Sequence, residues 1–140
     1  MGQNQLLLLL LSVVIVGMAI AVGVHAFDVA KQQNQADDVL NRNVRVAQEA
    51  VNWRARSTVH GGGGSGAYDP LATGGFEILD MKADMSHTEH AILSASGTTL
   101  EVVGVSTAAP NVGAYVRVEG NEIVETRTAL DGSIALPEAP

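Results

Sequence analysis

Residues 6–24 read LLLLLLSVVIVGMAIAVGV, and Ser12 is the only polar side chain among these nineteen residues. At a rise of ~1.5 Å per residue, a helix of this length is ~28 Å long, close to the thickness of the hydrocarbon core of a bilayer. The stretch is apolar on every side, whereas a helix at the surface of a soluble domain keeps one polar face. Residues 1–27 therefore predict a short N-terminus followed by a helix that needs a nonpolar environment all round.

The helical pattern continues beyond this stretch, over residues 28–60, but becomes amphipathic. No Pro occurs before Pro70, and apolar residues recur every three or four positions, which is the period of a helix with one buried face. The glycine run that starts at Gly61 ends the pattern, so we expect the helix to stop near Val59. We expect the apolar stripe to pack on a second layer of structure through Leu40, Val44, Val51 and Trp53.

The C-terminal half predicts a small antiparallel β-sheet. Residues 61–74 form a Gly-rich linker, residues 75–130 alternate between apolar and polar side chains, and residues 131–140 form a turn-rich tail. Gly120-Asn121 between two such runs is a strong signal for a two-residue hairpin. The whole chain is thus predicted as α+β, a long hydrophobic-then-amphipathic helix packed on a small sheet. The five expected strands are Leu79–Met85, His90–Ala95, Leu100–Val105, Ala114–Glu119 and Glu122–Arg127.

Charge is concentrated in the outer half of the chain. Residues 61–140 carry three basic and eleven acidic side chains, while residues 1–27 carry none of either kind. An acidic surface excludes nucleic acid as a partner, because nucleic-acid binding needs a basic footprint. The chain has no cysteine, which excludes disulfides, thiolate metal sites and a thiol nucleophile.

The candidates for chemistry are weak. His87-Thr88-Glu89-His90 could chelate a metal only from a turn, because residues three apart on a strand face opposite sides, and a solvated turn is the simpler interpretation. The glycine run lacks the Lys-Ser/Thr pair of a phosphate-binding loop. We find no catalytic constellation, so the sequence predicts a protein that is not an enzyme and binds no cofactor or metal.

The N-terminal segment is expected to be retained. A secretory signal peptide has basic residues before an apolar core of roughly 7–15 residues. Here no Lys or Arg precedes Lys31, and the core is longer. Cleavage after Ala26 is the alternative and would release a secreted protein. Because the short uncharged N-terminus has nothing to hold it outside, we expect the N-terminus inside and the C-terminal domain outside.

Taken together, these features resemble a type IV pilin or an archaeal-type pilin. The resemblance comprises the Gly2-Gln3 junction, the apolar segment, its amphipathic continuation and the β-rich remainder. It implies that a peptidase cuts between Gly2 and Gln3 and that the apolar helices bundle in the core of a filament. The residues that would form that core are Leu6, Leu7, Leu10, Val13, Val14, Gly17, Ile20, Gly23 and Phe27.

Two features depart from the family pattern. The leader has no basic residue, and Leu7 stands where bacterial pilins carry a glutamate that pairs with the amine of a neighbouring subunit. Either assembly does without that ion pair, or the chain is not cut after Gly2.

The sequence thus favours a structural subunit of an extracellular filament at the cell surface. Its partners would be identical subunits in a homopolymer, with the inner membrane holding the helix before assembly, and a surface receptor or glycan left open. The alternative is a single-pass, pseudopilin-like membrane protein whose small β-domain binds a partner outside the membrane.

Overall fold

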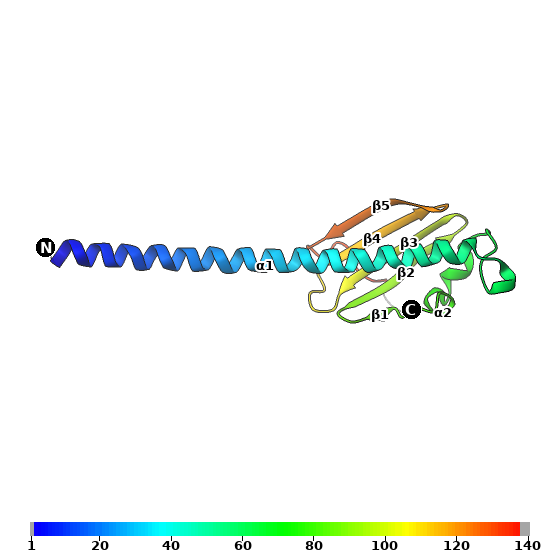
Figure 1. The fold of residues 1–140 in the computed structure, drawn as a ribbon, viewed down its shortest axis with the longest axis horizontal. Coiled ribbons are helices and arrows are strands. Elements are labelled where there is room, and N and C mark those ends of the chain that lie inside the picture. The colour runs from blue at the N-terminus through cyan, green and yellow to red at the C-terminus, as the bar shows by residue number, and fades with distance from the viewer. Residues whose placement is uncertain (1, 138–140) are drawn as a thin grey trace. The chain divides into compact units, whose positions relative to one another are not determined.

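A computed structural model describes residues 2–137 of the chain. The chain divides into two compact units, one that ends at Gln33 and one that begins at Asn34. The first unit is helix alone, and the second contains the end of the same helix together with a sheet (Figure 1).

Helix α1 extends from Gly2 to Ala55, so the predicted long helix is confirmed. It stops before the expected Val59, because the following residues fold back onto its last turn. The backbone N–H of Gly63 donates to the carbonyl of Trp53 at 2.8 Å, and that of Gly64 donates to Arg56 at 2.8 Å. The glycines thereby satisfy carbonyls that a helix end leaves without partners.

The stretch expected as a linker, residues 61–74, contains the short element η2 (Asp69–Ala72). It is flanked by η1 (Thr58–His60) and by helix α2 (Gly75–Ile78). Tyr68 and Leu71 within this stretch are fully buried, and the Tyr68 hydroxyl donates to the carbonyl of Gly120 at 2.6 Å. The segment therefore contributes side chains to the core of the second unit.

Five antiparallel strands form one sheet in sequential order, as predicted. Gly97 and Gly120 both have positive φ, at 56° and 64°, and each lies in the two-residue turn between neighbouring strands. The hairpin predicted at Gly120-Asn121 is confirmed. The strands are β1 (Asp84–Met85), β2 (Thr88–Ser96), β3 (Thr99–Ser106), β4 (Gly113–Glu119) and β5 (Glu122–Ala129).

The prediction of a strand over Leu79–Met85 is wrong except at its last two residues. Helix α2 ends at Ile78, and Asp80 has a φ of 55°, a left-handed conformation that no strand accommodates. The alternation of apolar residues has another cause here, since Leu79, Met81 and Met85 are partly buried against the core from a turn-rich segment. An alternation of apolar and polar residues in the sequence therefore does not by itself establish a strand.

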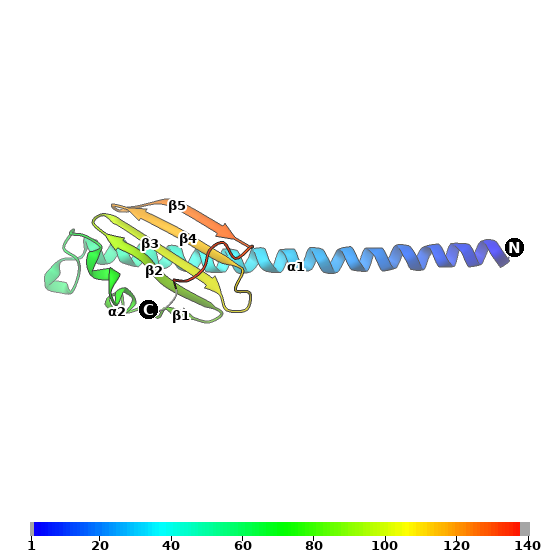
Figure 2. The ribbon, with the colours of Figure 1, turned by 180° about the vertical axis from the view of Figure 1, so that it is seen from behind.

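The core of the second unit lies between residues 34–55 of α1 and one face of the sheet. Figures 1 and 2, drawn from opposite sides, show this part of α1 along that face, with the other face of the sheet turned away from it. Leu100 and Val102 of β3 and Val116 and Val118 of β4 are fully buried in it. The helix residues buried there are Ala36, Val39, Asn43, Val46, Ala47, Ala50 and Trp53.

We expect Leu100→Ala to lower the free energy of unfolding of the second unit by about 2–5 kcal/mol, because it leaves a cavity in a fully buried site. Leu93→Ala is the matched control, since Leu93 on neighbouring strand β2 is 48% exposed and its truncation should change stability by less than about 1 kcal/mol. Urea unfolding of the full chain in nonionic detergent, followed by Trp53 fluorescence, measures both. Equal losses in the two variants would contradict the position of the core.

Candidate functional site

The most prominent surface of the first unit is the apolar segment Leu6–Phe27. Its large apolar side chains are between 44% exposed, at Val14, and 80% exposed, at Phe27. Of the predicted filament-core residues, Leu6, Leu7, Leu10, Val13, Val14, Ile20 and Phe27 are all exposed in this way. Nothing within residues 2–33 packs on them.

Between Leu6 and Val24 the polar groups are satisfied within the helix, and His25 just beyond this stretch is exposed. Its backbone is helical throughout, and the hydroxyl of Ser12 donates to the carbonyl of Leu8 at 2.5 Å. A bilayer tolerates only backbone and side-chain groups that are satisfied within the protein. An eighteen-residue window of α1 has a mean hydropathy of 2.9, which is apolar enough for a membrane span.

Two glycines interrupt the apolar surface. A Cβ built at Gly17 or Gly23 would have no atom within 4 Å, so nothing within this chain requires glycine there. The two residues leave shallow places on the helix at which another backbone can approach closely. Gly2 and Gln3, the predicted processing site, lie in the exposed first turn of α1.

The predicted packing residues of α1 occupy two different environments. Trp53 is 7% exposed within the core, while Leu40, Val44 and Val51 are only partly buried and lie against it. The side of α1 that contacts the sheet is therefore not centred on Leu40, Val44 and Val51, which lie at its edge. At the middle of the buried face stands a polar residue, Asn43, which is fully buried.

Asn43 joins the helix to two strands through a buried polar cluster, which we name the Asn43–His90–Thr88 cluster. The Asn43 amide donates to the carbonyl of Ala114 on β4 at 2.8 Å, and its Oδ1 lies 2.6 Å from Nδ1 of His90 on β2. Nε2 of His90 lies 3.0 Å from the hydroxyl of Thr88. An amide oxygen only accepts, so Nδ1 of His90 carries the proton and Nε2 accepts from Thr88.

Burial keeps His90 neutral. Desolvation, and after it the positive charge of Arg42, lower the pKa of His90 from 6.5 to about 4, and the negative charge of Asp38 opposes this. The interpretation of this stretch as a solvated turn is wrong for His90, which is 2% exposed. It holds for His87, an exposed residue at a φ of 66°. Within residues 2–137, no group of three His, Cys, Asp or Glu side chains could hold a metal ion.

Gly104 on β3 makes the cluster sterically feasible. A Cβ at this position would lie 2.8 Å from Oδ1 of Asn43 and would overlap the imidazole of His90. Sequence reasoning missed Asn43 and Gly104, because each reads as a minor exception in an apolar pattern. Their partners lie far along the chain, with Asn43 and His90 47 residues apart.

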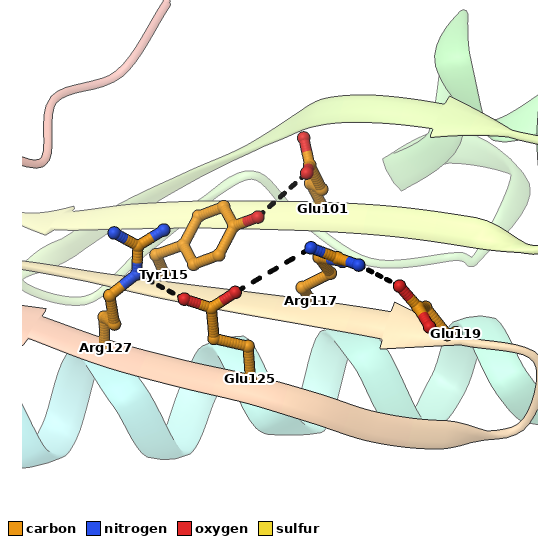
Figure 3. Close-up of polar contacts among 6 residues, drawn as sticks. All are labelled: Glu101, Tyr115, Arg117, Glu119, Glu125 and Arg127. Atoms are coloured by element: carbon orange, nitrogen blue, oxygen red, sulfur yellow. Dashed lines mark hydrogen bonds and ion pairs between the residues drawn. The ribbon is translucent and has the colours of Figure 1, made fainter.

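The face of the sheet turned away from α1 carries a second polar group of side chains, drawn in Figure 3. Glu125 of β5 forms an ion pair with Arg127 at 2.7 Å and lies 3.9 Å from Arg117 of β4. Arg127 also stacks over the ring of Tyr115 at 4.9 Å, and the Tyr115 hydroxyl donates to Glu101 at 2.8 Å. Burial, followed by the hydrogen bond to Glu101, raises the pKa of Tyr115 above 10.0.

These side chains have no arrangement that suggests catalysis. Their charges pair with one another at the surface, where each ion pair contributes about 1 kcal/mol or less. Tyr115 and Arg127 also line a shallow groove of about 230 Å³, together with apolar side chains such as Leu93, Val103 and Ile134. The face is best described as a solvated exterior stiffened by cross-strand pairs.

We expect Gly104→Ala to destabilise the second unit by about 1–3 kcal/mol, because its methyl group would force Asn43 and His90 apart. Gly23→Ala is the matched control, since a methyl group there meets nothing within 4 Å. Urea unfolding in detergent measures both variants. A Gly104→Ala protein as stable as the control would show that the cluster tolerates rearrangement.

Comparisons with protein-family models, with curated proteins and with solved structures find no match for this chain. The long apolar helix and the small antiparallel sheet are compatible with a pilin-like architecture.

Proposed function

We propose that the chain is a structural subunit of an extracellular pilus-like filament that polymerises through residues 6–27. The observation that supports this proposal most strongly is the exposed apolar surface of that segment. Fifteen large apolar side chains there are 44–80% exposed.

This apolar surface is so large that it must be shielded from water. Complete burial of a large apolar side chain contributes about 1.5–3 kcal/mol, so complete burial of fifteen of them would contribute on the order of 20–45 kcal/mol. A whole domain is stable by only about 5–15 kcal/mol. A segment left in water would therefore associate with any nonpolar surface, either lipid or further copies of itself.

Further copies can cover the segment on all sides at once. Its apolar residues surround the helix, so a bundle of identical helices buries every one of them, and Gly17 and Gly23 allow close approach. The partly buried Leu40, Val44 and Val51 offer additional surface to neighbouring subunits. Repeated head-to-tail contacts of this kind generate an open helical polymer. The bilayer of the inner membrane would hold the segment before assembly.

The second unit would form the exterior of the filament at the cell surface. Its acidic composition keeps neighbouring filaments apart and is unsuited to nucleic acid. We infer a role without catalysis, because the polar groups found in it act as a buried structural cluster and as surface ion pairs. A receptor or a glycan is a candidate partner for this exterior.

The second candidate is a single-pass membrane protein with a partner-binding domain outside the membrane. It is favoured by the mean hydropathy of 2.9 and by a segment length that matches one bilayer. Lipid alone would then cover residues 6–27, and close approach between helices would not be needed.

We expect Gly17→Leu to separate the two candidates. The larger side chain keeps the segment apolar, so membrane insertion should be unchanged, but it obstructs close packing between helices. Overpacking costs about 1–3 kcal/mol per contact, and 1.4 kcal/mol is tenfold in an equilibrium constant. Filament mass sheared from cells, measured by sedimentation and electron microscopy, should therefore fall by about tenfold or more.

Val16→Leu is the matched control, because it adds one methylene at a position that already carries a side chain, and it should assemble normally. Wild-type cells without any sheared filaments, and with all of the protein in the membrane fraction, would refute the filament and leave the single-pass anchor.

A further inference from the structure

The Asn43–His90–Thr88 cluster is the principal polar connection between residues 34–55 of α1 and the interior of the sheet. Asn43 is the one polar residue on the buried face of the helix within the described chain, and it bonds to both β2 and β4. The remaining contacts of that face are apolar and do not by themselves fix a helix in one position along the sheet. The cluster is therefore placed to hold the middle of this helical stretch in its register, while near the helix end Arg54 donates to Asn121 in the turn between β4 and β5 at 3.0 Å.

The neutral Nδ1–H form of His90 satisfies every hydrogen bond of the cluster, and burial opposes the charged form. Nε2 accepts from the Thr88 hydroxyl and Nδ1 donates to Asn43. A proton added at Nε2 would turn this acceptor into a donor and place a charge in a site that is 2% exposed. The hydroxyl of Thr88 could rotate and accept, but the charge would remain desolvated.

The surroundings of His90 offer little to stabilise such a charge. From α1, Asp38 and Arg42 face it, but they pair with each other at 3.2 Å and so largely cancel. From β3 it meets Gly104, which has no side chain. On the side of η2 and α2, Glu77 lines the same cavity of about 350 Å³ as His90, at an exposed position.

We propose that the Asn43–His90–Thr88 cluster is an acid-sensitive latch, which holds residues 34–55 of α1 on the sheet at neutral pH and releases them when His90 binds a proton. Release exposes the apolar face of the helix around Val39, Val46 and Ala50. This device does not depend on the filament proposal.

The direction of the pH dependence follows from linkage. The pKa of His90 is about 4 in the closed state and 6.5 when the imidazole is free in water, so the open state binds more protons. Stability of the latch is complete above pH 6.5 and falls as the pH decreases towards 4. For these two values, the population of the open state at pH 5 is about 30-fold higher than at pH 8.

Hydrogen exchange of the full chain in nonionic detergent tests the latch, with rates corrected for the intrinsic effect of pH. We expect peptides from residues 43–53 to show an opening constant about 30-fold larger at pH 5 than at pH 8, while peptides from the hairpin of β4 and β5 change much less. His90→Asn places an amide N–H near Nδ1 without a titratable group and should abolish most of this difference.

His87→Asn is the matched control, because it removes an exposed histidine from a left-handed position that asparagine accepts. It should keep the wild-type response. An unchanged acid response in His90→Asn would overturn the proposal, and so would an equal loss of protection in the helix and the hairpin.

A second measurement uses only the wild-type chain, in case His90→Asn does not fold. Nitrogen NMR of the imidazoles should show His90 as the Nδ1–H tautomer, with a titration midpoint near 4. A midpoint near 6.5, or the Nε2–H tautomer, would overturn the latch.

Discussion

The apolar surface of residues 6–27 is the constraint on which the rest of the protein depends. A helix that is apolar on all sides has no stable place in water, and nothing within residues 2–33 covers it. The second unit has its own core and needs none of these side chains. The chain therefore combines a small folded domain with a helical segment that needs a nonpolar environment from outside the chain, either lipid or further copies.

The fold was predictable to the extent that it depends on local patterns. Alternation and turn residues located β2 to β5, because Gly97 and Gly120 supply the positive φ that their two-residue turns need. The same reasoning failed at Leu79–Met85, where alternating apolar residues contact the core from a turn. It also treated the glycines after α1 as a linker, although Gly63 and Gly64 bond to the end of the helix.

The polar cluster could not be predicted, because it exists only through contacts between distant parts of the chain. Asn43 and Ala114 are 71 residues apart, and Gly104 is needed only because His90 and Asn43 meet above it. In the sequence, Asn43 interrupts the apolar face that the structure buries, and the expected packing residues Leu40 and Val44 lie at the side of that face. Both the amide nitrogen and the amide oxygen of Asn43 are hydrogen-bonded, which favours one orientation of the helix on the sheet. The cost is the desolvation of these polar groups.

Whether copies of this chain cover one another through residues 6–27 can be measured by the intact mass of protein that is sheared from cell surfaces and sedimented as polymer. We expect a sedimenting polymer whose subunits retain Leu6–Phe27. The measured mass should correspond to a chain that begins at Gln3 if the leader is processed, or at Met1 if it is not. A sheared protein that begins at Phe27 would contradict the account, because its assembly surface would be missing. Complete absence from the sheared fraction would contradict it equally.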